Sequence, residues 1–419
     1  MQEQHHELKL CVSVALVALM AAAHAAGPTS VVLPGRFATD RDERGIAIPE
    51  VRVSGTGAND RLSDAFGRFE LMFSGKKPAD EVQVVYKYRD WELVNHASLP
   101  YVLRNPPAPI LQLILSPPSE VRQRRVTYYA GPSIESANKE FEQKTSEAQR
   151  AVATGRITQS ELETQRKQLE VERDRKVSIA KETADHLANV PAARQDRQFR
   201  SAMEEMANGN ADRALILMKA RNDSLVKAAP GTSPAAPVLF QAQLQQLTGD
   251  FAGADQTLRK ATALDPNSPL VRQGLGAYQL RVNRPDLGRP NLLRALELAR
   301  GVGGVQDAAS VLGELGAVSG AELQLDESRR YLTQAILLRE HFAKRSGVVN
   351  DRKLATLYDE LGRTELKANR TSEALTNMEQ ALKLYKGMEV QNQLLDRPRL
   401  STLESQVRNV RESSGQVQP

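Results

Sequence analysis

The sequence has almost no cysteine and few aromatic residues. Its only cysteine is Cys11 among 419 residues, so the chain cannot close an internal disulfide and must be stabilised by packing. Aromatic residues make up 5% of the chain and Trp91 is its only tryptophan. Ala, Leu, Gln, Glu and Arg are abundant instead. This composition favours a mostly helical protein, and the length is sufficient for two or three domains.

Sequence signatures of catalysis are also missing. His96, His186 and His341 lie in three different segments with no metal-binding spacing,. Gly75-Lys76-Lys77 lacks the rest of a phosphate-binding loop, and there is no G-x-S-x-G motif,. We therefore predict a protein that is not an enzyme and binds no cofactor or metal. An enzyme that takes its acid and base from distant segments would instead need a deep polar pocket with perturbed carboxylates.

The net charge gives no sign of a nucleic-acid partner. It is only +5, and basic and acidic residues alternate along the charged segments. The densest basic run, Arg122-Gln123-Arg124-Arg125, is short. Nucleic-acid-binding proteins concentrate basic residues on one face, so we predict no such partner.

Long apolar runs are limited to the beginning of the chain. Residues 10–23 are almost wholly apolar but too short for a comfortable membrane span, and Ala23-His24-Ala25 follows them,. This layout predicts a signal peptide over residues 1–25 that is cleaved after Ala25, although Lys9 is the only basic residue of its n-region before the apolar run,. An uncleaved anchor is the alternative. We expect an exported protein, periplasmic or secreted, with no membrane span after cleavage.

Residues 29–117 have the pattern of a small antiparallel β-sandwich. Strands are expected at residues 30–38, 46–54, 68–73, 82–88 and 110–115, where β-branched or aromatic residues lie between turn formers,. Asp64-Ala65-Phe66-Gly67 predicts a tight turn with a positive φ at Gly67,. Trp91 near a strand edge is interpreted as a packing residue, with a ligand platform as the alternative.

Two stretches of this region resemble the carboxypeptidase regulatory-like domain, a transthyretin-like β-sandwich of exported bacterial proteins. They are Gly45 to Val53, which includes Ile48-Pro49-Glu50-Val51, and Ser63 to Leu71, which includes Asp64-Ala65-Phe66-Gly67-Arg68-Phe69. Ile48-Pro49-Glu50 departs from the family order, with Glu50 at a glycine position. The resemblance implies an accessory, non-catalytic domain.

A highly charged helical region follows. Prolines near residues 106–118 predict the end of the β-domain, and residues 118–133 are expected to form a connector,. Residues 134–190 predict a charged helical hairpin, because two thin apolar stripes flank the break at residues 154–157. Thr158-Gln159-Ser160-Glu161 predicts a capping box at the start of the second helix,. This arm is either a spacer or a coiled-coil surface for self-association.

Residues 198–388 contain a repeated pattern of small and large residues. Each repeat has a small anchor, a large apolar residue four positions later and another small residue twelve positions earlier; the anchors are Ala214, Ala254, Gly288, Ser328 and Ala374. Such spacing lets two antiparallel helices approach closely and stack on the next pair. The pattern resembles the tetratricopeptide repeat (TPR), although only the step from Ala254 to Gly288 has the nominal period of 34 residues,. The resemblance implies an all-α right-handed superhelix.

The predicted fold class is therefore a multidomain α+β protein: a small antiparallel β-sandwich, a charged helical hairpin, and a TPR-like superhelix. Residues 389–413 are expected to form a polar capping helix and residues 414–419 a disordered tail,.

The resemblance to TPR proteins also implies a concave groove that binds a protein or peptide. Carried over to this chain, the groove positions are Leu239, Gln243, Gln246, Gln273, Leu280, Arg281, Asp359, Arg363 and Lys367. The lysine and asparagine clamp of chaperone-binding members is absent, because Leu239, Gln243 and Ala277 occupy its positions. We predict an exported, non-enzymatic interaction scaffold. The alternative is a cell-envelope structural or carbohydrate-associated protein that acts through the β-sandwich.

Overall fold

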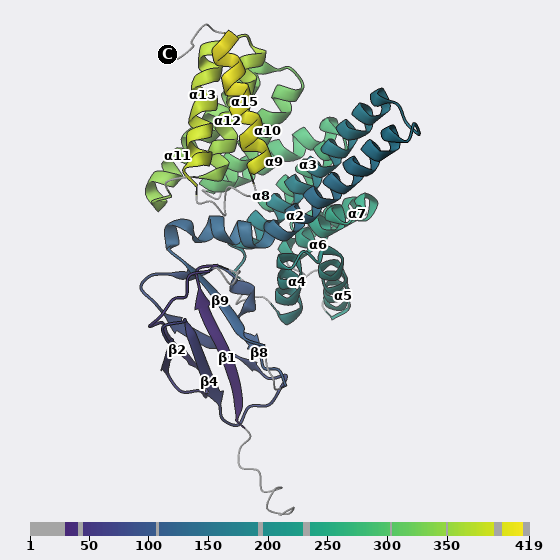
Figure 1. The fold of residues 1–419 in the computed structure, drawn as a ribbon. Helices are drawn as coiled ribbons and strands as arrows, with labels where there is room; N and C mark the ends of the chain where they lie inside the picture. Colours follow the sequence, from purple (N-terminus) through teal and green to yellow (C-terminus); the bar gives the residue numbers. More distant parts are fainter. Residues whose placement is uncertain are drawn as a thin grey trace, which may run out of the picture. The chain divides into compact units, whose positions relative to one another are not determined.

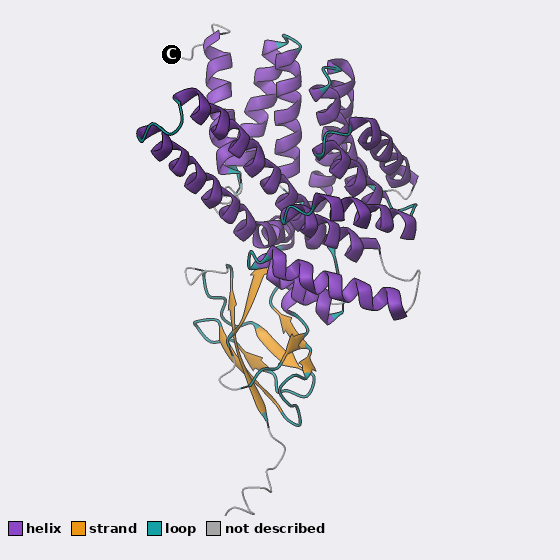
Figure 2. Cartoon of the chain, turned by 90° about the vertical axis from the view of Figure 1, so that its right-hand side faces the viewer, coloured by secondary structure: helices purple, strands orange, loops and turns teal. Residues whose placement is uncertain are grey.

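The structure is a computed structural model that describes residues 30–40, 45–105, 109–191, 196–228, 235–301, 304–348, 351–388 and 396–413. The predicted signal peptide at residues 1–25 and the predicted tail at residues 414–419 lie outside these ranges. The chain divides into two compact units, Met1–Ser116 and Pro117–Pro419. The first contains strands and the second contains helices (Figures 1 and 2).

The described residues of the first unit form a β-structure of three small sheets. A four-stranded sheet has the order β4-β1-β9-β7, a three-stranded sheet β3-β2-β6, and a pair β5-β8. The strands are β1 (Val31–Ala38), β2 (Arg52–Gly55), β3 (Arg61–Leu62), β4 (Arg68–Phe73), β5 (Glu81–Val82), β6 (Val84–Lys87), β7 (Glu92–Leu93), β8 (Tyr101–Val102) and β9 (Leu111–Ser116), with the short helix η1 (His96–Ser98). Alternate residues of β1 and β4, such as Leu33 and Leu71, are fully buried in the core between the strands.

Two details of this unit differ from the sequence prediction. The pairing is not wholly antiparallel, because β1 and β9 run parallel, with Gly35 opposite Leu111. The strand expected at residues 46–54 begins only at Arg52. Pro49 has no N–H to donate and Glu50 has a positive φ of 59°, so neither suits a regular ladder,.

The predicted turn at Asp64 and the packing of Trp91 are confirmed. Gly67 has φ of +71°, and a Cβ there would lie 2.3 Å from the carbonyl oxygen of Phe37. The Asp64 carboxylate accepts hydrogen bonds from the backbone N–H groups of Phe66 and Arg68, both at 2.8 Å. Trp91 packs against the core of the unit and edge-on to Tyr88, with 5.5 Å between ring centroids.

The second unit begins with a long helical hairpin, the arm, formed by α2 (Pro118–Ala153) and α3 (Gln159–Asn189). Residues 118–133 are therefore not a connector, as predicted, but the first half of α2. Pro132 removes one hydrogen bond within the helix. The helix continues because residues before and after Pro132 in the sequence are buried and hold it in place: Val126, Tyr129, Ala130 and Ile134,. The predicted capping box is confirmed: Thr158 Oγ1 accepts from the Glu161 N–H at 3.2 Å, and Glu161 accepts from the Thr158 N–H at 2.6 Å.

Five helix pairs follow the arm in the described part of the chain. They are α4 (Arg197–Ala207) with α5 (Ala211–Ala228), α6 (Ala235–Leu247) with α7 (Phe251–Leu264), α8 (Pro269–Arg281) with α9 (Pro285–Gly301), α10 (Val305–Ala321) with α11 (Leu325–Ser346), and α12 (Arg352–Lys367) with α13 (Thr371–Lys386). Each pair packs on the next, and the first helices α6, α8, α10 and α12 also contact one another in that order. This is a TPR-like stack.

The small and large residues of the repeat pack as predicted. A Cβ on Gly276 would lie 2.9 Å from Leu292, one on Gly316 2.6 Å from Leu332, and one on Gly362 2.7 Å from Met378. Each glycine precedes its repeat anchor by twelve residues, and each large residue follows it by four. Because the backbones approach this closely, the helices of a pair leave no room for a side chain at these glycines.

The last described helix is α15 (Arg397–Ser413), which packs on α13. It accounts for most of the capping helix predicted at residues 389–413, while residues 389–395 lie outside the described ranges. Its Leu403, Val407 and Val410 are buried in the apolar cluster of the final repeats. The helix thus covers the end of the stack.

Candidate functional site

The first helices of the repeats form one continuous surface, which we call the first-helix face, made by α6, α8, α10 and α12. The second half of α3 lies against it (Figure 1): α3 packs on α6, and polar contacts join it to α8 and α12. None of the described side chains at residues 237–247 of α6 or 269–281 of α8 is exposed. The surface predicted to be an open groove is therefore partly covered by the chain's own arm, which packs on α6 and binds α8 through Arg281.

Two of the predicted groove residues, Arg281 and Gln243, meet α3 around Glu182, and a third, Gln246, binds Arg281. Arg281 forms an ion pair with Glu182 and also donates to Gln246 Oε1 at 2.5 Å. Gln243 Nε2 donates to Glu182 at 3.5 Å. The side-chain oxygen Oε1 of Gln243 lies 3.2 Å from Nδ1 of His186. Because an amide oxygen only accepts, Nδ1 of His186 carries the proton and donates it. Side chains from α6 and α8 thus converge on one turn of α3.

His186 on α3 and Glu314 on α10 are buried groups with incomplete partners. Burial lowers the pKa of His186, and its Nε2 has no hydrogen-bond partner among the described residues. Gln273, another predicted groove residue, donates to Glu314 Oε1 at 2.6 Å, while Glu314 Oε2 has no partner there. Burial first, and then the nearby Glu182 carboxylate, raise the pKa of Glu314 to about 7. The face therefore contains a carboxyl group that is poorly suited to carrying its charge.

Further along the arm, Asp185 joins α3 to the last repeat. Its carboxylate lies 2.6 Å from Lys353 Nζ on α12 and 2.9 Å from Arg122 on α2. Burial opposes ionisation of Asp185, but Lys353 and Arg122 outweigh it and hold its pKa well below the ordinary value. Asp396, just before α15, binds Lys181 of α3 and Arg352 of α12, each at 2.6 Å. Alternating charges thus hold the arm to the end of the stack.

The remaining polar groove residues, Asp359, Arg363 and Lys367, lie on α12. The bonds described below join them to residues other than those of α3. Asp359 is buried and forms an ion pair with Arg399 of α15. Burial raises the pKa of Asp359, although Arg399 opposes this. Arg363 binds Glu360 at 2.9 Å, and Lys367 donates to the Gly320 carbonyl at 2.9 Å. The nine predicted residues are therefore not brought into one cluster.

The two predicted apolar groove residues pack between helices. Leu239 is 1% exposed and lies where a Cβ on Gly274 would be 2.6 Å away. Leu280 is half-buried and packs close to Gly288. The prediction that Leu239 is available to a partner is wrong, because this side chain fills the space opposite Gly274,. For Leu280 it stays a prediction.

Sequence reasoning missed the residues of α3 that occupy the face. Lys181, Glu182, Asp185 and His186 are charged or ionisable and lie in a segment that reads as part of a solvated arm. One signal was present. The small residues Ala180, Ala184 and Ala188 recur every four positions, and all are buried, whereas the first half of α3 is mostly exposed. Small residues in this register allow a helix to approach a packed surface closely.

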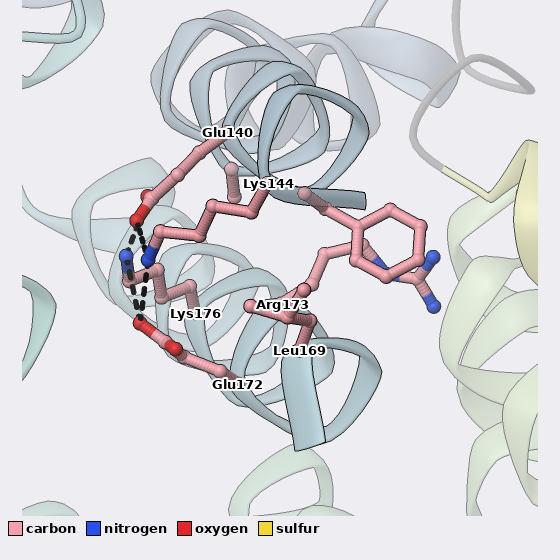
Figure 3. A pocket seen from close by; sticks show the side chains of 8 residues that line it. Glu140, Lys144, Leu169, Glu172, Arg173 and Lys176 are labelled. Atoms are coloured by element: carbon pink, nitrogen blue, oxygen red, sulfur yellow. Dashed lines mark hydrogen bonds and ion pairs between the residues drawn. The ribbon is translucent and has the colours of Figure 1, made fainter. Parts of the chain in front are cut away.

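The outer half of the arm carries a cluster of charges of alternating sign between its two helices. A shallow hollow between α2 and α3 is bordered by Glu140, Lys144, Glu172 and Lys176, which alternate in sign (Figure 3). Lys144 and Lys176 both bind Glu140, at 2.7 and 2.6 Å, and Lys176 also lies 3.3 Å from Glu172. Hydrogen bonds from the two lysines lower the pKa of Glu140. These groups are one-third or more exposed, except Lys176, so each pair contributes at most about 1 kcal/mol,.

No group of three or more His, Cys, Asp or Glu residues in the described ranges is placed to hold a metal ion. No helix in the same ranges is both long enough and apolar enough to cross a membrane.

Comparison with known proteins gives only distant similarities. No family model matches the chain, and no curated protein matches it. Among solved structures, MamA is 18% identical and aligns over 45% of this chain and 90% of its own, with a TM-score of 0.34. TTC0263, a TPR protein of Thermus thermophilus, is 20% identical over 49% of this chain and 96% of its own, with a TM-score of 0.35. YrrB, described as a TPR protein with an unusual peptide-binding site, is 16% identical over 48% of this chain and 91% of its own, with a TM-score of 0.33. The description of the fold as TPR-like rests on the helix pairs themselves.

Proposed function

We propose that this chain is an exported, non-enzymatic scaffold that binds a helical segment of a protein partner on its first-helix face. The observation that carries the proposal is that this face already holds a helix, α3, through specific polar contacts. Gln243, Arg281 and Lys353 come from three different first helices and all bind α3. A surface whose side chains can satisfy one helix has the chemistry to bind another of similar character.

Export is supported by the apolar run at residues 10–23 and the small residues after it,. Mass spectrometry of the protein from its native host provides the test. We expect a mature chain that begins at Ala26. An intact N-terminus on a membrane-bound protein would instead support an anchor.

Affinity capture with the full chain tests the scaffold function. Arg281→Glu with Lys353→Glu reverses two charges of the face. Arg259→Glu with Arg294→Glu makes the same change on the second helices α7 and α9, where both side chains are exposed. We expect a partner that binds the wild type and the control but not the first variant, and that binds again as a purified protein in calorimetry. A partner captured equally by all three proteins would refute binding at this face.

The β-unit supports a second candidate function, as a cell-envelope structural or carbohydrate-associated module of the carboxypeptidase regulatory-like kind. Val32 and Met72 lie opposite each other in the β1–β4 ladder and are 40% and 48% exposed. Adjacent exposed apolar side chains are typical of contact surfaces. Val32→Ser with Met72→Ser should abolish envelope association if this unit makes the main contact, and leave it intact if the first-helix face does.

A further inference from the structure

The arm occupies the surface on which the proposed function depends. Over residues 179–188 of α3, seven side chains are buried, and four of these are alanine or threonine. The specific contacts of this segment with the first helices are polar: Glu182 with Arg281, Asp185 with Lys353, and His186 with Gln243. Ion pairs of this kind depend on charge and geometry, so a helix with the same charges in the same register can form them equally well.

The fit between the arm and the face is incomplete. Nε2 of His186 and Oε2 of Glu314 are buried without a hydrogen-bond partner in the described part of the chain. The carboxylate of Glu182 also lies close enough to disfavour the charge on Glu314. Buried polar groups without partners weaken a contact relative to one in which all are satisfied. The unpartnered nitrogen of His186 leaves the face together with α3, whereas Glu314 stays on it. A ligand helix that donates a hydrogen bond to Glu314 would therefore bind the face better than α3 does.

The contacts among the later repeat pairs do not depend on α3. The pairs α6–α7 to α12–α13 contact one another directly. The arm also packs on the first pair, because α2 contacts α4 and Ser133 lies 3.9 Å from the sulfur of Met206. Release of α3 therefore changes the packing of the arm on α4 but leaves the contacts among the later pairs in place.

We propose that residues 178–189 of α3 are a built-in competitor, and that the partner is a protein whose helix carries two carboxylates three positions apart. These carboxylates replace Glu182 and Asp185 at Arg281 and Lys353, with small residues between them where α3 has alanine and threonine. The inference rests on the proposed function, because it names the class of ligand for the same face. Binding then requires the arm to leave, which keeps the scaffold closed until such a helix is present.

The test uses the mature full chain and a fluorescent synthetic peptide with the sequence of residues 176–190. The variant Glu182→Arg with Asp185→Arg repels the arm from the face. Glu163→Arg with Glu170→Arg makes the same charge change in the exposed first half of α3. Fluorescence anisotropy measures peptide binding, and amide hydrogen exchange over residues 178–189 shows whether α3 has left the face.

We expect the first variant to lose protection over these residues and to bind the peptide at least tenfold more tightly than the wild type or the control. Adding Arg281→Glu and Lys353→Glu should abolish that binding, because the arginines of the arm can then pair with the new glutamates of the face. Protection over residues 178–189 should return in this variant, which shows that the protein is still folded.

Three results would overturn the inference, and they separate it from the proposed function. Equal peptide binding to wild type and variant would leave the face as a binding site but refute competition by the arm. Unchanged protection of α3 in the variant would show that these charges do not hold the arm. Loss of protection without any peptide binding would refute the proposed function itself.

Discussion

Glu314→Gln should stabilise the helical unit, and by an amount that depends on pH. Burial and the nearby Glu182 raise the pKa of Glu314 from 4.5 to about 7. One pH unit of pKa change corresponds to about 1.4 kcal/mol, so the ionised carboxylate costs the folded state roughly 3 kcal/mol. Glutamine keeps the oxygen that accepts from Gln273 and removes the charge. The substitution therefore removes the cost of burying a carboxylate.

The sign of the pH dependence follows from linkage. Below pH 4.5, Glu314 is protonated in both the folded and unfolded states and contributes no penalty. Between pH 4.5 and about 7 the unfolded chain loses the proton while the folded chain keeps it, so wild-type stability falls as pH rises,. Above about pH 7 the penalty is constant. The variant should thus exceed the wild type most at alkaline pH.

Urea denaturation followed by circular dichroism at 222 nm measures this difference, because the helices dominate that signal. We expect the advantage of the variant to grow by about 3 kcal/mol between pH 4.5 and pH 8.5. Glu163→Gln, at an exposed position on the arm, is the matched control and should give a flat difference. A flat difference for Glu314→Gln as well would show that this carboxyl group is not held in the protonated form.

Three further substitutions test the packing of the helical unit. Gly276→Val should destabilise it by about 1–3 kcal/mol, because a Cβ there already meets the facing helix,. Gly301→Ala is the control and should change the stability little, because the space around its Cβ is open. Thermal melts compare the two variants. Thr158→Ala should remove the capping box at a cost of about 1 kcal/mol,, seen as faster amide exchange in the first turn of α3 and nowhere in the repeats. Arg339→Met should lower the free energy of unfolding by about 3–5 kcal/mol in urea melts. The buried Asp351 lies 2.7 Å from Arg339 and would lose its cation,. A loss below 1 kcal/mol would show that water compensates.

The sequence by itself determined the parts of this protein that depend on local spacing. The helix pairs of the repeats were predictable because small residues such as Gly316 and large ones such as Leu332 recur at a fixed separation that only close helix packing requires,. The start of α3 was predictable because Thr158 and Glu161 satisfy backbone groups within one turn,. The turn at Gly67 was predictable for the same local reason,.

Only the tertiary structure decided where the arm lies and which residues meet on the first-helix face. Glu182 and Arg281 are 99 residues apart, and Asp185 and Lys353 are 168 apart. No local pattern links such pairs, because charged residues on a helix suit solvent and an ion-pair partner equally well. The extension of α2 through Pro132 was missed for a related reason: the buried residues on either side of it offset the lost hydrogen bond, and their burial depends on the fold,.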